Sequence, residues 1–339
     1  MRFGPVPLAQ AEGAILAHSL ILGAVRLRKG QLLGPGELAA LREAGHAEVT
    51  VARLDPDDIA EDAAAARLAA ALAPEPEAAG LSLAAPFTGR ANLHATEAGL
   101  LVVDRAAVDR LNRIDPALTL ATLPPWQRVA PGLLVATVKV IAFAVPEATL
   151  AAATAALPGP DAAPAVRVAP FRLRSAGLVL TRTPGQPAKL NDKGRAAVAA
   201  RLEALGMTLA GTAEVSHAIA PLATALAAAP GEAVLLLTGS ATSDAADVGP
   251  AALIAAGGRL ERFGMPVDPG NLLFLGELAG RPVIGLPGSA RSPVPHGADW
   301  VLERIACGLP VTSDDIAAMG VGGLLKEIPS RPQPRERRR

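Results

Sequence analysis

The chain has 339 residues, enough for two or three domains, and its formal net charge is zero, with 32 basic and 32 acidic residues. This neutral balance argues against a general nucleic-acid surface, which needs excess Lys and Arg to neutralise phosphates. Tyrosine is absent and aromatic residues make up 2% of the chain, so binding of single strands by base stacking is poorly supported.

The sequence favours a cytoplasmic protein that does not enter a membrane. The first residues lack a sustained apolar segment, so we expect no signal peptide. The longest apolar run, 133–145, is interrupted by Lys139 and is too short to span a bilayer. Cys307 is the single cysteine, which excludes an intrachain disulfide and fits a reducing compartment. The scattered histidines show no metal-ligand spacing, so we expect them to be structural.

Residues 1–80 predict a small α/β unit. An apolar extended segment leads into a hairpin-like stretch at 26–33 and a helix within 34–46, with Gly45 just past its end. A short alternating strand is expected at 48–53. The segment 55–72 opens with aspartates and continues with alanines, which predicts a helix that has an aspartate cap and an acidic first turn.

Residues 81–165 predict a strand-rich unit followed by a linker. Apolar alternation indicates strands at 88–95, 99–104, 119–123 and 133–145, around one helix at 104–112. The Ala- and Pro-rich segment 149–165 indicates a boundary, although its first half also suits a helix.

Residues 166–330 follow a strand–helix order that predicts parallel strands with crossover connections. We expect strands at 178–181, 208–215 and 233–237, helices at 193–205 and 217–228, a hairpin turning at Ala279 and Gly280, and a closing helix at 297–307. Residues 331–339 form a basic tail, which we expect to be solvated.

Small and polar residues follow the apolar strand 233–237, in the order T-G-S-A-T-S-D-A-A-D-V-G-P-A. Open parallel sheets bind ligands at the carboxyl ends of their strands, where small residues let backbone N–H groups reach an anion. Asp244 and Asp247 could accept hydrogen bonds from a ligand ring or hold Mg²⁺ against a phosphate. Asp247 also suits the cap of a following helix with Pro250 in its first turn, and the two roles are compatible.

Two Pro-Gly segments follow. Asp268, Pro269, Gly270 and Asn271 form a turn sequence, either as a plain turn or as part of a site. In the second segment, Pro287 and Gly288 end a predicted strand and are followed by two serines and an arginine. Arg291 is suited to a bidentate phosphate contact with Ser289 and Ser292 as further donors, or alternatively to a surface ion pair. Ser289 lacks the G-x-S-x-G setting of a nucleophile.

These segments resemble the molybdopterin-binding proteins of molybdenum cofactor biosynthesis. The segment 238–251 is similar to the T-G-G-T-G…D-V-T-P motif of molybdopterin adenylyltransferase. The segment 269–292 resembles the P-G-K-P…G-L-P-G-N-P-x-S signature of molybdopterin molybdenumtransferase. The whole chain looks closer still to bacterial molybdopterin-binding modules that are often fused to a cytidylyltransferase-like domain.

The resemblance implies an α/β fold whose C-terminal half is a doubly wound molybdopterin-binding domain, preceded by smaller α/β and β-rich units. It implies that Thr238, Gly239 and Ser240 let the backbone approach the ligand, and that Asp244 and Asp247 act as catalytic groups toward the pterin or Mg²⁺. A last set would complete the cofactor-binding wall: Asp268, Pro269, Gly270, Asn271, Pro287, Gly288, Ser289, Arg291 and Ser292. The implied partners are molybdopterin, molybdate, a separate cytidylyltransferase and a second copy of the chain in a homodimer.

The chain departs from the family motifs at several positions. Ser240 and Thr242 replace expected glycines, Asn271 replaces the lysine of P-G-K, and L-P-G-S-A replaces L-P-G-N-P. The retained acidic pair favours assistance in molybdate insertion, whereas the lost lysine favours a non-catalytic carrier that delivers the cofactor. Hydrolysis of the kind carried out by nicotinamide mononucleotide deamidase-like proteins is a third possibility, and the segment 269–292 argues against it.

Overall fold

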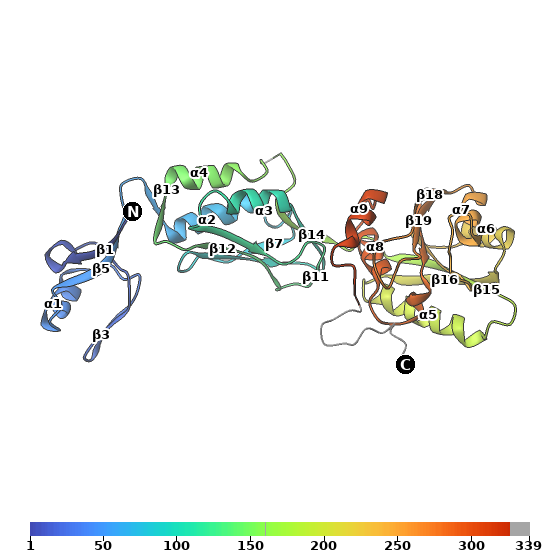
Figure 1. Ribbon diagram of the computed structural model, residues 1–339, viewed down its shortest axis with the longest axis horizontal. Helices are drawn as coiled ribbons and strands as arrows, with labels where there is room; N and C mark the ends of the chain where they lie inside the picture. The colour runs from blue at the N-terminus through green and yellow to red at the C-terminus, as the bar shows by residue number, and fades with distance from the viewer. Residues whose placement is uncertain (160, 326–339) are drawn as a thin grey trace, which may run out of the picture. The chain divides into compact units, whose positions relative to one another are not determined.

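The computed structural model describes residues 1–159 and 161–325, which divide into two compact units with a boundary between Pro170 and Phe171 (Figure 1). The predicted basic tail, 331–339, lies outside the described residues. Within the described part of the chain, every helix is too short or too polar to cross a bilayer.

The first 53 residues form a small antiparallel sheet with a core of its own. Three strands pair in the order β1 (Arg2–Pro7), β5 (Glu48–Arg53) and β2 (Ile15–Leu16). A hairpin joins β3 (Leu20–Leu22) to β4 (Val25–Leu27), and the helices are η1 (Leu8–Gln10) and α1 (Pro35–Glu43). The predicted end of α1 is confirmed, because Gly45 adopts a φ of +83° just beyond it. The hairpin begins ahead of the predicted stretch 26–33: its turn contains Gly23, with a φ of +61°, and only its second strand reaches into that stretch.

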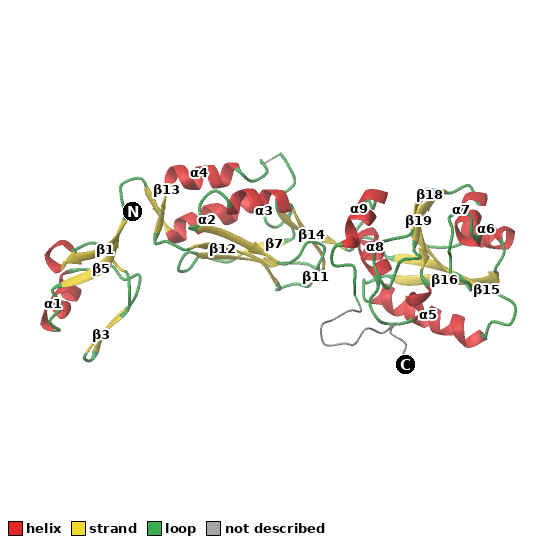
Figure 2. Ribbon diagram, in the orientation of Figure 1, coloured by secondary structure: helices red, strands yellow, loops and turns green. Residues whose placement is uncertain are grey.

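The rest of the first unit surrounds a second core, spread over residues 64–168. Its sheets have the orders β10-β12-β8-β7, β11-β9-β14 and β13-β6. The strands are β6 (Asp58–Ala60), β7 (Leu81–Leu83), β8 (Arg90–Ala95), β9 (Gly99–Val103), β10 (Leu118–Thr122), β11 (Arg128–Val129), β12 (Leu134–Val140), β13 (Ala144–Pro146) and β14 (Val166–Pro170). The helices α2 (Glu61–Leu72), α3 (Arg105–Asn112) and α4 (Glu147–Ala155) lie along one side of β7 and β12 (Figure 2).

Two local predictions meet different outcomes here. The helix predicted at 104–112 is confirmed as α3, and the carboxylate of Asp104 caps it by accepting a hydrogen bond from Ala107 N at 3.0 Å. The aspartate cap of α2 is wrong: the helix begins only at Glu61, and its N-cap residue, Ala60, has no capping side chain. Asp58 instead lies in β6 and forms an ion pair with the N-terminal amine of Met1 at 2.7 Å.

The second unit is a six-stranded sheet in the order β16-β15-β17-β20-β19-β18. The strands are β15 (Ser175–Arg182), β16 (Thr208–Ser216), β17 (Ala233–Leu237), β18 (Arg259–Phe263), β19 (Phe274–Leu278) and β20 (Arg281–Leu286). The first four strands in this order run parallel, and the β19–β20 hairpin is antiparallel. Its predicted turn is confirmed, because Ala279 and Gly280 both have a positive φ.

Helices cover both faces of this sheet. They are α5 (Ala188–Glu203), α6 (Ile219–Ala228), α7 (Val248–Ala255), α8 (Gly297–Ala306) and α9 (Ser313–Ala317), with the short η2 (Gly288–Arg291) and η3 (Ala318–Gly320). In β17, Leu235 and Leu237 share a core with α5 and α8, whereas Val234 and Leu236 share another core with α6 and α7. Since successive strand residues face opposite sides, this alternation requires a helix layer on each face. The predicted doubly wound α/β arrangement is confirmed.

Candidate functional site at the carboxyl edge of the second sheet

The topology brings the predicted site segments to one edge of the second sheet. The strands β15, β17 and β20 are parallel, so their carboxyl ends meet at the same edge. Phe274, the first residue of the antiparallel β19, pairs with Gly285 near the end of β20, so the preceding turn at 268–271 reaches this edge too. The segments 238–247, 268–271 and 287–292 therefore occupy a shared edge.

In the segment 238–247, both aspartates accept hydrogen bonds from backbone amides of their own loop. Asp247 caps α7, because its Oδ1 accepts from Val248 N at 2.7 Å and its Oδ2 accepts from Ser243 N at 3.0 Å. The exposed Asp244 accepts one hydrogen bond from Ala246 N at 2.7 Å. The described residues contain no group of three or more His, Cys, Asp or Glu that could hold a metal ion. The capping role of Asp247 is present, and the ligand roles of both residues stay predictions.

Gly239 is held tightly at the start of this loop. Its N–H donates to Thr181 Oγ1 at 2.7 Å, so this amide is already engaged within the protein. A Cβ at position 239 would lie 2.4 Å from Gln186 Oε1 and 2.9 Å from the carbonyl oxygen of Thr181. Glycine is therefore required here by close packing. Thr238 fixes the next turn, because its hydroxyl donates to the carbonyl of Ser240 at 2.6 Å.

A buried polar cluster beneath Gly239 was missed in the sequence. Thr181 is fully buried, and its hydroxyl oxygen lies 2.9 Å from Nδ1 of His217. Asn191 donates to the carbonyl of Thr181 at 3.3 Å and accepts from Gln186 Nε2 at 2.9 Å. The sequence does show polar residues after the predicted strand at 178–181. It could not predict their contacts, because the partners come from three different strand ends.

Arg291 links the ends of two strands. Its Nη2 donates to the carbonyl of Thr238 at 2.8 Å, and burial lowers the pKa of the guanidinium from its ordinary value. It forms no ion pair with any residue that the structure describes, and its Nε is buried without a hydrogen-bond partner there. Gly194 in α5 lies beside it: a Cβ at that position would make ordinary contact with Arg291 Cγ at 3.5 Å but would lie only 2.6 Å from Leu237 Cδ2.

Ser289 carries a second unsatisfied polar group. Its hydroxyl oxygen is buried and finds no partner among the described residues. Buried polar atoms are rarely left without a partner, so such an atom indicates a place for a water molecule or a ligand. Ser292 is already engaged: its carbonyl accepts from Arg201 at 2.6 Å, and its hydroxyl accepts from Val294 N at 3.3 Å.

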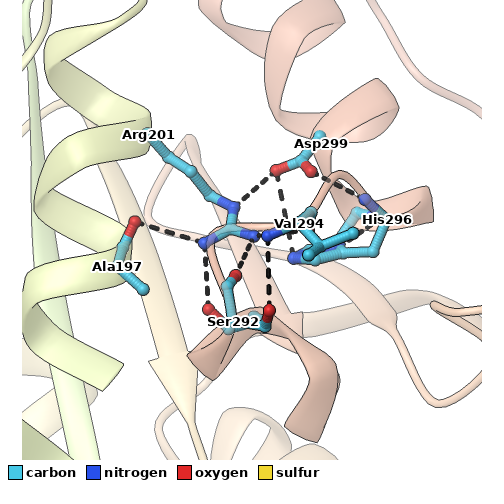
Figure 3. A network of polar contacts seen from close by, with 8 residues as sticks. Ala197, Arg201, Ser292, Val294, His296 and Asp299 are labelled. Carbon is cyan, nitrogen blue, oxygen red and sulfur yellow. Dashed lines mark hydrogen bonds and ion pairs between the residues drawn. The ribbon is translucent and has the colours of Figure 1, made fainter. Parts of the chain in front are cut away.

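Arg201, also missed in the sequence, clamps the segment that follows β20 (Figure 3). Its guanidinium donates to Asp299 Oδ1 at 2.7 Å and to the carbonyl of Ser292 at 2.6 Å. Further bonds reach the carbonyls of Ala290, Val294 and Ala197, at 2.9, 3.2 and 3.2 Å. This clamp fixes the backbone on both sides of Arg291.

His296 ends the same segment as the N-cap residue of α8. Its Nδ1 accepts from Ala298 N at 3.2 Å, while its own backbone N–H donates to Asp299 Oδ2 at 2.8 Å. The side chain is 1% exposed. Burial lowers the pKa of His296 from 6.5 to about 4; the carboxylate of Asp299 opposes this shift and the Arg201 cation adds to it. The ring is therefore neutral at physiological pH.

The turn 268–271 packs against the start of α8. The carbonyl of Pro269 accepts from Gly297 N at 2.8 Å, and Asp268 N donates to the carbonyl of Gly323 at 2.8 Å. Gly270 adopts a φ of +145°, and a Cβ there would lie 2.9 Å from Gly297 N. Asn271 is exposed and is held only loosely, with its Nδ2 at 3.4 Å from the carbonyl oxygen of Met265.

Two cavities lie at opposite edges of the second sheet. One of about 510 Å³ adjoins the carboxyl edge and is lined by Arg182, Thr183, Pro184, Glu214, Val215, Ser216 and His217. Another of about 580 Å³ lies toward the amino edge, with Glu232, Arg259 and Glu277 among its lining residues. Neither is lined by a residue of the predicted site. The candidate site therefore rests on the arrangement of its polar groups and not on a cavity.

Comparisons with known proteins find one family match and weak structural likenesses. Residues 5–53 match a domain of unknown function (DUF8806). A molybdopterin biosynthesis MoeA protein from Pyrococcus horikosii has 15% identity and a TM-score of 0.28, covering 93% of this chain and 75% of that one. A molybdenum cofactor biosynthesis protein from Pyrococcus furiosus has 11% identity and a TM-score of 0.24, covering 94% and 65%. Likenesses of this extent carry no argument about fold or function. No curated protein matches the chain.

Proposed function

We propose that the second unit binds molybdopterin at the carboxyl edge of its sheet and serves molybdenum cofactor biosynthesis. The observation that carries the proposal is the pair of unsatisfied buried donors, Ser289 Oγ and Arg291 Nε, in the segment after β20. A hydroxyl and a guanidinium N–H from the same short segment are groups that suit the oxygens of a phosphate. This segment is also part of the sequence motif that resembles molybdenumtransferases.

The remaining predicted residues receive roles within the same proposal. Residues 238–240 would form the first wall, with Asp244 and Asp247 toward the pterin ring. Asn271, exposed on the turn 268–271, would lie at the rim. The donor set fits Mg²⁺ weakly, because both oxygens of Asp247 already accept backbone hydrogen bonds. We therefore assign the ion no step.

Two activities fit such a site. Assistance in molybdate insertion would use the acidic pair, whereas a carrier would only bind molybdopterin and deliver it, for example to a separate cytidylyltransferase. The engaged carboxylate of Asp247 favours the carrier.

Calorimetric titration of the full chain with molybdopterin under anaerobic conditions tests molybdopterin binding, which both activities share. Binding at micromolar concentrations or tighter is expected, and tighter binding when molybdate is present would favour the insertion role. Absence of binding would refute the proposal.

Replacing Arg291 with alanine is expected to weaken molybdopterin binding about 30-fold, since charge-assisted hydrogen bonds contribute about 2 kcal/mol each. Calorimetry on the full chain measures the change. Arg259→Ala is the matched control, because Arg259 lines the cavity toward the opposite edge of the same sheet. If Arg291→Ala binds like the wild type, the site is misplaced. An equal loss in Arg259→Ala would show a general charge effect instead.

A further inference from the structure

We infer that Thr181 and His217 are positioning residues that set the loop 239–247 for its ligand. The inference rests on the molybdopterin-binding function proposed above and extends it to two residues outside the predicted motifs. Neither residue is assigned to the ligand itself. They act through Gly239, which lies just after the end of β17, at the start of the loop.

The three groups form a continuous chain of hydrogen bonds across three strand ends. Thr181 Oγ1 accepts from Gly239 N at 2.7 Å and lies 2.9 Å from His217 Nδ1. A hydroxyl has one donor and two acceptor positions. With Gly239 N–H on one acceptor position, the hydroxyl keeps its donor position and its second acceptor position for the contact with His217 Nδ1. The fully buried Thr181 hydroxyl therefore has partners at both neighbouring strand ends.

His217 is itself fixed by its backbone. Its N–H donates to the carbonyl of Arg182 at 3.0 Å, so the backbone that carries the ring is tied to the end of β15. Its neighbours in the adjoining cavity include Arg182 and Glu214, which form an ion pair with each other. His217 therefore lies between an open cavity and the buried hydroxyl.

Gly239 transmits this fixation to the loop. A Cβ at this position would lie 2.4 Å from Gln186 Oε1 and 2.9 Å from the carbonyl oxygen of Thr181, so the residue has little free space on that side. The following turn is held by the bond from Thr238 to Ser240, and the far end of the loop is held by Asp247 at the start of α7. Loss of the Thr181 bond would leave this end of the loop held by the bond from Arg291 to the carbonyl of Thr238 and would free the Gly239 amide.

The test compares Thr181→Val, which removes the hydroxyl at nearly constant shape, with Thr181→Ser, which keeps it. In the full chain, Thr181→Val is expected to speed amide hydrogen exchange in residues 239–247 at least tenfold and to weaken molybdopterin binding at least tenfold. Thr181→Ser is expected to restore both within threefold. His217→Leu should follow the valine variant, and His217→Asn, whose amide can replace Nδ1, should follow the serine variant.

Each outcome decides between this inference and the proposed function. If the wild type binds molybdopterin and Thr181→Val binds equally well, the positioning role is wrong and the function stands. If the wild type does not bind, the function is wrong, and unchanged exchange in Thr181→Val would then overturn the positioning role separately. Faster exchange throughout β17 in the valine variant, without rescue by serine, would show a general structural role and would also overturn the inference.

Discussion

Replacing Arg201 with methionine is expected to lower the free energy of unfolding of the second unit by about 3–5 kcal/mol, the usual cost of breaking a buried ion pair. The Arg201 and Asp299 side chains are only 10% and 15% exposed. Methionine keeps the apolar stem but donates nothing, so Asp299 and four backbone carbonyls lose a donor at once. Unpaired buried acceptors carry their full desolvation penalty.

Urea denaturation followed by tryptophan fluorescence measures this effect. The chain has two tryptophans, Trp126 and Trp300. Trp300 lies in α8, so a Trp126→Phe background makes the signal specific to the second unit. Arg259→Met is the control, because Arg259 is 65% exposed and its ion pairs should contribute at most about 1 kcal/mol. A loss below about 1 kcal/mol in Arg201→Met would show that the clamp does not stabilise the fold.

Acid is expected to destabilise the second unit through His296, by about 3 kcal/mol between pH 6.5 and pH 4. The folded-state pKa of His296, about 4, lies below the ordinary 6.5. Between these two pH values the unfolded chain therefore binds a proton at this histidine and the folded chain does not. Stability from this group is therefore complete above pH 6.5, falls as the pH drops, and levels off below pH 4. Protonation also removes the Nδ1 lone pair that accepts from Ala298 N and caps α8.

His296→Asn isolates this contribution. Asparagine is a favourable N-cap residue and does not titrate, so it keeps the cap while it removes the pH dependence. Unfolding free energies measured from pH 7 to pH 4 should fall less steeply in the variant than in the wild type. Other titrating groups cancel in the comparison because they are common to both proteins. Equal slopes would contradict a buried neutral His296.

Arg201 and His296 together hold the segment after β20 through hydrogen bonds. Arg201 holds the carbonyls of Ala290, Ser292 and Val294, and His296 ends the segment at the start of α8. Ser289 and Arg291 are thereby presented on a fixed backbone. Preorganised donors bind an anion without the entropic cost of ordering a loop. The two stability predictions therefore also concern the candidate site.

The sequence was most informative where local chemistry decides the conformation. Asp247 caps a helix, as one of its two predicted roles required, because a capping carboxylate needs only the next few amides of its own chain. The strand 233–237 is buried on both faces, as its uninterrupted apolar character indicates. The start of α2 was misplaced because Asp58 is drawn away by the N-terminal amine, a partner 57 residues distant.

The sequence predicted which segments form the candidate site, but not which side chains contact one another there. The segments 238–247, 268–271 and 287–292 do reach one edge, since parallel strands bring their carboxyl ends together. Arg201 gave no signal, because one arginine on a predicted helix is ordinary until Asp299, 98 residues later, packs beside it. The role of Thr181 could not be predicted from the sequence either, because its partners Gly239 and His217 follow other strands.

By itself, the sequence determined the helix and strand periods, the caps and turns, and the resemblance of two segments to molybdopterin-binding motifs. These properties depend mostly on neighbours within a few residues; the misplaced start of α2 is the exception, because a distant partner engages Asp58 there. The tertiary structure alone decided which polar groups are satisfied. It engaged Asp247 and the Gly239 amide within the protein, and left Ser289 Oγ and Arg291 Nε without partners among the described residues. Hydrogen-bond satisfaction depends on atoms distant in sequence, so only the packed sheet and its helices can fix it.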